Sequence, residues 1–159
     1  MNGVYQQIVE RIRGEALDLD KAVSKAQRSW FKALKHTEEQ DLYLDSVALN
    51  LHGFYSGIER LFELIARGLD RITPVGESWH RDLLEQMTRN VFNTRPAVIS
   101  VLNAERLDEY RRFRHLVRNI YAADLIPERM ARMLINLPGL WTDLRAELLA
   151  FADFLDQSS

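Results

Sequence analysis

The sequence contains no cysteine. That absence excludes a disulfide framework, thiol catalysis and a cysteine-ligated zinc site. No apolar run reaches the roughly 20 residues that a membrane-spanning helix needs. Charged residues also interrupt the N-terminal segment where a secretion signal would need its apolar stretch. We therefore expect a soluble, cytoplasmic protein that does not associate with a membrane.

Glycine and proline are also scarce, with seven and four residues in a chain of 159. Few breaks of this kind favour long, uninterrupted elements. No segment alternates apolar and polar residues as a half-buried strand would. Hydrophobic residues make up 47% of the chain, which is enough to bury one core without a metal or a disulfide. We predict an all-α fold in which residues 1–159 form a single domain.

Apolar residues recur at helical spacing in five segments. The helices are expected at about 2–35, 40–69, 79–91, 103–122 and 128–155. Loops of about four to eight residues between them favour an up-and-down bundle of four to five main helices. Gly53 and Gly57 lie four residues apart on the second helix and would let another helix backbone approach closely. The clearest buried face is expected at Leu51, Phe54, Tyr55, Ile58, Leu61, Phe62, Ile65 and Leu69.

Local signals predict where the helices begin and break. Ser78 and Asn103 are expected N-caps of the third and fourth helices. Pro127 suits the first turn of the last helix, and Pro138 is expected to kink or divide it. The first helix is expected to bury one stripe, made of Ile8, Ile12, Leu19, Val23, Ala26, Trp30 and Leu34.

Most motifs that carry chemistry are missing. The sequence has no glycine-rich phosphate loop, no Gly-x-Ser-x-Gly elbow and no His-Glu-x-x-His pair. None of the four histidines has a second metal ligand four residues later. We therefore predict neither a metal site nor a cofactor. The three tryptophans, Trp30, Trp79 and Trp141, are expected in the core or at a dimer interface.

The fourth predicted helix is unusually basic. All four lysines lie in the first 35 residues and the other 17 basic residues are arginines, four of them between residues 110 and 121. Arg111, Arg114, His115 and Arg118 form a stripe at helical spacing, whose like charges repel by a few tenths of a kcal/mol per pair. Such a stripe suits an anion, since the arginine fork matches phosphate. Alternatively, the arginines are solvated or pair with acids of a neighbouring helix, for example Glu59, Glu63 or Glu85.

The segment FRHLVRNIY at residues 113–121 resembles the signature helix of the HEPN superfamily, and of its HepT-like branch in particular. Three further sequence segments are similar to the same branch: ALNLHGFYSGIERLFELIA, GESWHRDLLEQM and the Leu-Pro-x-x-Trp of the last helix. The resemblance runs from about Leu44 to the C-terminus. It implies an all-α bundle of HEPN type that pairs as a homodimer. It also implies a metal-independent ribonuclease toxin of a toxin–antitoxin system, with an MntA-type nucleotidyltransferase as its antitoxin.

The family motif is an arginine, four residues, a histidine, one residue and a tyrosine. Arg114 and Tyr121 match the two ends, but Asn119 stands at the histidine position. The resemblance implies that Arg114 stabilises phosphate charge and that the antitoxin attaches AMP to Tyr121. Asparagine cannot exchange a proton near neutral pH, and losing such a group typically costs a factor of about 10² to 10⁴.

Two histidines are candidates to compensate for Asn119. His115 precedes it by one helical turn, and His80 follows Trp79 at the expected start of the third helix. We therefore name Arg114, Asn119, His115 and Tyr121 as the candidate catalytic residues. Arg111, Arg118 and His80 are the candidate contacts to RNA phosphates.

Three functions stay open at this point. The first is an RNA-cleaving HepT-like toxin. The second is a catalytically impaired HEPN domain that binds RNA, a nucleotide or a nucleotidyltransferase partner. The third is a helical scaffold whose arginines only pair with acids. The sequence does not decide whether the protein is an enzyme.

Overall fold

The computed structural model describes residues 2–119 and 127–158, with side chains at 3–114 and 127–158. Its described residues form an all-α bundle, as predicted, with one isolated β-bridge between Val91 and Arg95. No helix in these ranges is long and apolar enough to cross a membrane. The helices are α1 (Asn2–Lys35), α2 (Gln40–Ile65), α3 (Trp79–Gln86), α4 (Val101–Asn119) and α5 (Pro127–Ser158), with short turns η1 (Thr37–Glu39) and η2 (Ala66–Asp70).

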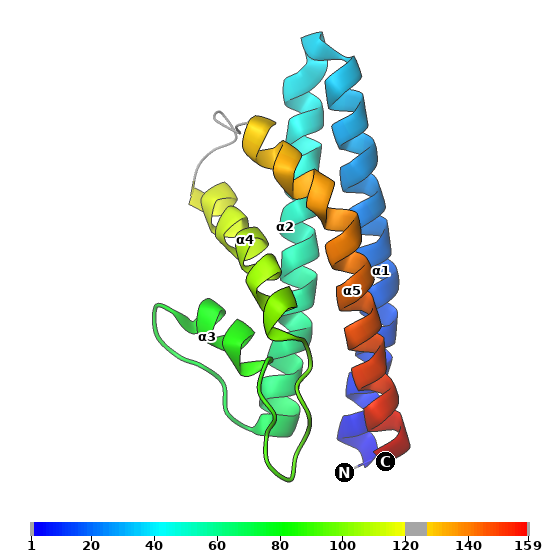
Figure 1. The fold of residues 1–159 in the computed structure, drawn as a ribbon, viewed down its shortest axis with the longest axis vertical. Coiled ribbons are helices and arrows are strands. Elements are labelled where there is room, and N and C mark those ends of the chain that lie inside the picture. The colour runs from blue at the N-terminus through cyan, green and yellow to red at the C-terminus, as the bar shows by residue number, and fades with distance from the viewer. Residues whose placement is uncertain (1, 120–126, 159) are drawn as a thin grey trace.

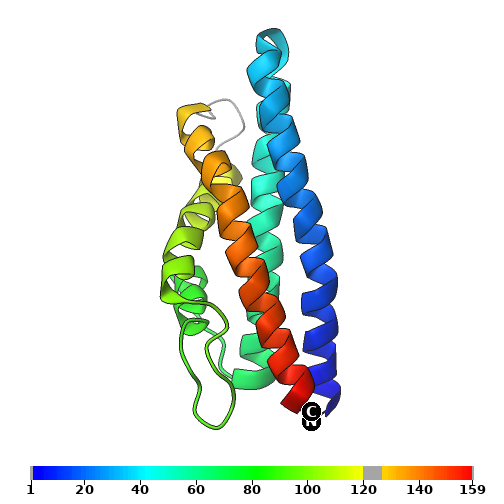
Figure 2. The same cartoon turned by 45° about the vertical axis from the view of Figure 1, so that its right-hand side comes forward.

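The long helices α1 and α2 form an antiparallel hairpin along the length of the molecule (Figure 1). Helix α5 packs on α1, and the start of α1 and the end of α5 lie together at one end of the bundle (Figures 1 and 2). Helix α4 contacts α2 and α5, whereas the short α3 contacts α2 and α4. Helices α3 and α4 therefore both pack on α2 and on each other.

The core follows the predicted apolar faces closely. Every predicted member of the α2 face is buried except Leu69, which is half-buried. The α1 stripe is buried as far as Ala26, and Trp30 is half-buried. Leu34, however, is 56% exposed, so its predicted burial is wrong. It lies in the tip of the α1–α2 hairpin, which projects beyond α5 and has less protein to cover it (Figure 2).

Only one of the two glycines on α2 has another helix packed against it, and that contact is with side chains rather than with the predicted backbone. A Cβ atom at Gly57 would lie 2.7 Å from Glu15 Oε1 and 2.9 Å from Leu19 Cδ2, both on α1. At Gly53 the same atom would meet nothing within 4 Å. The Glu15 and Leu19 side chains of α1 therefore occupy the space that Gly57 leaves, and the prediction for Gly53 is wrong.

Two predicted helix caps are corrected by the structure. Ser78 makes no side-chain capping bond, because its backbone (φ −98°, ψ 18°) lies outside the extended region that N-cap residues adopt. Asn103 lies inside α4, and the Ser100 hydroxyl accepts the backbone N–H of Asn103 instead. Ser100 is thus the residue that caps α4, and the fourth helix begins at Val101 rather than at residue 103.

Pro138 does not divide the last helix, which runs unbroken from Pro127 to Ser158. A proline inside a helix removes the bond to the carbonyl four residues earlier. Here that carbonyl belongs to Leu134, and it accepts a hydrogen bond of 2.9 Å from Gln27 Nε2 on α1. A side chain from the neighbouring helix therefore satisfies the group that Pro138 leaves open.

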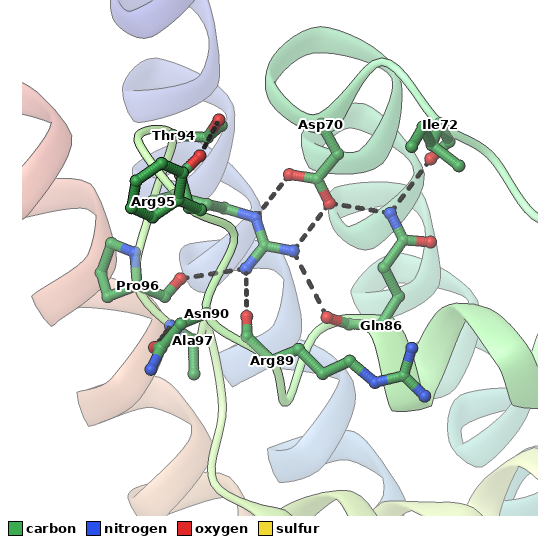
Figure 3. Close-up of polar contacts among 10 residues, drawn as sticks. Asp70, Ile72, Gln86, Arg89, Asn90, Thr94, Arg95, Pro96 and Ala97 are labelled. Atoms are coloured by element: carbon green, nitrogen blue, oxygen red, sulfur yellow. Dashed lines mark hydrogen bonds and ion pairs between the residues drawn. The ribbon is translucent and has the colours of Figure 1, made fainter.

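The connection at residues 87–100 is longer than the predicted loops because it is built around a buried arginine (Figure 3). The Arg95 side chain has no exposed surface and pairs with Asp70 through Nε at 2.6 Å and Nη2 at 2.7 Å. Its remaining hydrogen bonds go to the backbone carbonyls of Gln86, Arg89 and Pro96.

The Asp70–Arg95 pair joins three segments that are separate in sequence. Asp70 ends η2, Gln86 ends α3, and Arg95 lies in the loop that leads to α4. Gln86 also donates to Asp70 Oδ2 at 2.7 Å and to the Ile72 carbonyl at 3.0 Å. This also explains why α3 ends at Gln86 and not at residue 91, as predicted. The network holds α3 against the end of α2 and so positions the first residues of α3.

Candidate functional site

A single buried carboxylate on α2 holds two candidate site residues. Glu59 is 3% exposed. Its Oε1 accepts a hydrogen bond of 2.8 Å from Arg114 Nη1 on α4, and its Oε2 lies 2.8 Å from His80 Nδ1 on α3. The arginine and histidine nitrogens are themselves 3.5 Å apart. Glu59 is thus the centre of a three-residue cluster, which we call the Glu59 cluster (Glu59, His80 and Arg114).

The position of each member follows from local structure. Glu59 lies on the buried face of α2, four residues after Tyr55 and three before Phe62, so its side chain points toward the core side. Phe113 is buried, and the next residue, Arg114, is directed toward α2. The start of α3 at Trp79 brings His80 to the same place. A carboxylate buried there is tolerated because both of its oxygens have partners.

The cluster opens to solvent through a cleft of about 700 Å³. The exposed fractions of the side chains rise from 4% for Glu59 to 16% for Arg114 and 27% for His80. Glu59 therefore forms the floor, and the arginine and the histidine are accessible from outside. The cleft is lined by His52, Gly53, Ser56, Glu59, Arg60, Glu63, Trp79, His80 and Arg114.

Polar atoms without partners gather beside this cluster. Among the described residues, the Tyr55 hydroxyl, Ser56 Oγ and Arg114 Nε are buried and make no hydrogen bond. Burial raises the pKa of Tyr55, and the charge of Glu59 raises it further. The hydroxyl therefore stays protonated at neutral pH. Buried polar groups normally have partners, so unmet hydrogen-bonding capacity is concentrated where α2 meets α4.

The structure brings together only some of the residues predicted for the site. Arg114 and His80 meet at Glu59, as described above. Arg111 pairs instead with Asp108, at 2.6 Å within α4. Residues 115, 118 and 119, which are His115, Arg118 and Asn119, lie on the described backbone of α4, but their side chains are outside the described residues. Tyr121 lies outside the described residues altogether.

Two features of the site were not anticipated from the sequence. Glu59 was considered only as a counter-ion for an arginine, and its second contact, to His80, was missed. The sequence did contain a signal for this contact. Glu59 is a charged residue between Tyr55 and Phe62 on an otherwise apolar face, and a buried carboxylate requires partners for its oxygens. Trp79 was expected in the core or at a dimer interface. It is half-buried, lines the cleft and stacks on His80 with ring centroids 3.6 Å apart.

Metal-binding residues are not grouped in the described part of the chain. Within residues 3–114 and 127–158, no three His, Asp or Glu side chains are close enough together to hold a metal ion. At the centre of the cleft, the Glu59 cluster provides a guanidinium, an imidazole and a carboxylate that contacts both. Such a set can bind a phosphate and exchange a proton with a neighbouring group.

Comparison with known proteins adds a family to this geometry. A family model described as HepT-like protein matches residues 46–155, a range that contains the whole Glu59 cluster. No curated protein and no solved structure matches the chain. The family match spans more than half of the sequence and agrees with the all-α bundle, which is of HEPN type. The chain therefore belongs to the HepT-like protein family.

Proposed function

We propose that this HepT-like protein is a metal-independent endoribonuclease and the toxin of a toxin–antitoxin pair. The observation that carries the proposal is the Glu59 cluster, in which one buried carboxylate holds the motif arginine and a histidine 3.5 Å apart in an open cleft. The motif lacks its own histidine, because Asn119 occupies that position. His80 supplies an imidazole at the same arginine from another helix.

Arg114 is suited to bind the scissile phosphate. Its contact with Glu59 uses Nη1, and the side chain keeps 16% of its surface exposed toward the cleft. Guanidinium groups bind phosphate oxygens through charge-assisted hydrogen bonds. The charge that develops on the phosphate oxygens during cleavage would be stabilised most where water is partly excluded. Arg60 also lines this cleft, but its Nη2 pairs with Glu15 at 3.2 Å, so Arg114 is the main candidate for the phosphate.

His80 is suited to remove a proton. A carboxylate can only accept, so the bond to Glu59 places the hydrogen of neutral His80 on Nδ1 and leaves the lone pair on Nε2. Nε2 would take the proton of an RNA 2′-hydroxyl, whose oxygen then bonds to the adjacent phosphorus. The bond from phosphorus to the 5′ oxygen breaks, and that oxygen takes a proton from water. The hydroxide that remains takes the proton from His80, which restores the neutral imidazole. The products are a 2′,3′-cyclic phosphate and a 5′-hydroxyl.

The proposal includes regulation by partners. By resemblance, Tyr121 is the residue to which an MntA-type nucleotidyltransferase would attach AMP, and the active form would be a homodimer. Incubation with such a transferase and ATP should add one adenylyl group to the chain, and Tyr121→Phe should prevent it. Native mass spectrometry should find two chains in the active particle. An adenylylated Tyr121→Phe variant would rule out this tyrosine as the acceptor.

A second candidate function rests on Asn119. If proton transfer requires the motif position itself, the same cleft binds RNA, a nucleotide or a transferase partner without cutting RNA. Asn119→His would then create ribonuclease activity in an inactive protein. Under the first candidate, the natural protein already cleaves RNA and depends on His80.

The test is cleavage of a labelled RNA pool by the purified protein in the presence of EDTA. We expect cleavage by the natural protein, unchanged by the chelator, and its loss by at least about 100-fold in Arg114→Ala. Arg132→Ala is the matched control, because Arg132 is an exposed arginine outside the cleft that pairs with Glu109. Cleavage retained in Arg114→Ala, or lost equally in Arg132→Ala, would contradict the assignment of the cleft.

A further inference from the structure

A second cleft adjoins the one that holds the Glu59 cluster. Its volume is about 590 Å³, and it lies between the end of α2, the turn η2, the loop at 73–76 and the start of α3. Glu63 and Trp79 line both clefts, whereas His80 and Arg114 line only the first. Trp79 is therefore shared by the two clefts, and it stacks on His80, which lines only the first.

The position of Trp79 makes its ring a platform. The rings of Trp79 and His80 are stacked at an interplanar angle of 29°, so His80 covers part of the indole on the side of the first cleft. The second cleft is also lined by Pro74 and Val75, and Val75 is 85% exposed. A flat, apolar group that entered this cleft would be covered by the indole and by these loop side chains.

The polar groups of the second cleft suit a nucleobase and its neighbouring phosphate. The Glu63 side chain makes no hydrogen bond or ion pair within the described residues, so its carboxylate can accept an N–H from the edge of a base. Arg67 is exposed at the same cleft and can meet a phosphate. Bases that stack on aromatic side chains beside a positive charge are typical of single-stranded nucleic acid recognition.

We propose that the second cleft is a nucleobase subsite, in which a base of an unpaired RNA strand stacks on Trp79 while an adjoining phosphate lies at Arg114. The proposal rests on the proposed ribonuclease function and deepens it by naming the substrate class. A base inside a duplex is already stacked and paired, so it cannot reach the indole. The enzyme would thus select single-stranded RNA at the nucleotide next to the cleaved bond.

The experiment compares two uncleavable strands of equal length and charge. One is a 2′-O-methyl oligoadenylate and the other is the same ribose–phosphate chain without bases. We expect the adenylate to quench tryptophan emission and to bind more tightly than the abasic strand. Trp79→Leu should weaken adenylate binding by roughly 5- to 150-fold and leave abasic binding unchanged. Trp79→Phe should retain most of the affinity, because it keeps an aromatic face.

Two controls separate this subsite from the proposed function. Trp30→Leu removes a half-buried tryptophan that lines neither cleft, and it should bind both strands as the natural protein does. Arg114→Ala should weaken both strands, because it removes a phosphate contact. If Arg114→Ala weakens both strands but Trp79→Leu changes neither, the RNA cleft stands and the base subsite is wrong. Equal weakening of both strands by Trp79→Leu also overturns the subsite, and failure of the natural protein to bind either strand overturns both proposals.

Discussion

The ion pair between Asp70 and Arg95 yields the sharpest prediction about stability. Asp70→Asn keeps the shape of the side chain but removes its charge. The Arg95 guanidinium then remains fully buried, with three backbone carbonyls and a neutral amide as its surroundings. Breaking a buried ion pair by removing one partner typically costs about 3–5 kcal/mol. We expect a loss of that size in the free energy of unfolding.

Urea unfolding followed by circular dichroism measures this loss directly. Thermal unfolding gives a second measure. For a domain of this size, 1 kcal/mol corresponds to about 2–4 °C in Tm, so the Tm of Asp70→Asn should fall by about 6–20 °C. The control is Glu85→Gln, which breaks a 3.9 Å pair with Arg89 whose side chains are 57% and 70% exposed. That change should stay within about 0.5 kcal/mol. A loss below about 1 kcal/mol in Asp70→Asn would refute the reasoning, because the pair would then not hold the loop.

Three further predictions follow from the core and the cluster. Tyr110→Phe should lower the free energy of unfolding by about 1 kcal/mol, because it removes a 2.7 Å hydrogen bond to the Met133 carbonyl of α5. Tyr55→Phe should leave the free energy of unfolding unchanged or raise it, because the Tyr55 hydroxyl has no partner among the described residues. Burial raises the pKa of both hydroxyls in the folded protein, so the free energy of unfolding of the natural protein should fall as the pH rises above about 10. Each variant lacks one of these hydroxyls and should show a smaller fall, and an equal fall in all three proteins would contradict this. Gly57→Ala should destabilise by about 1–3 kcal/mol in thermal unfolding and Gly53→Ala should not, because only the first methyl meets α1; the reverse order would contradict the packing. Glu59→Gln should lower the rate of RNA cleavage more than it weakens RNA binding, because it disturbs the orientation of both groups it contacts; an unchanged rate would contradict that role.

The helices could be predicted from the sequence because burial of apolar surface dominates their formation. The face of α2 from Leu51 to Ile65 repeats at helical spacing, and all of its predicted members in that range are buried. Leu34 shows the limit of this argument. Its spacing is equally regular, but no periodicity reports how far a neighbouring helix extends.

Polar contacts between distant segments could not be predicted in the same way. Asp70 and Arg95 are 25 residues apart, and neither lies in a pattern that marks it as buried. Choosing between Ser100 and Asn103 as a cap depends on backbone angles that both residues could adopt in isolation. Arg114 was found through its motif, and Glu59 was one of three acids predicted as possible partners of the arginines. The structure confirms this pair, but only the packing of α2 against α4 selects Glu59 from the three.

The proposed replacement of the motif histidine is tested at His80. We propose that His80, held by Glu59, takes the role of the missing motif histidine next to Arg114. The measurement is single-turnover cleavage of one labelled single-stranded RNA by the natural protein and by His80→Gln, with binding of the same RNA measured in parallel. We expect His80→Gln to reduce the cleavage rate by a factor of about 10² to 10⁴ and to change RNA binding far less. Full-rate cleavage by His80→Gln would contradict the proposal, because the proton would then be transferred by another group.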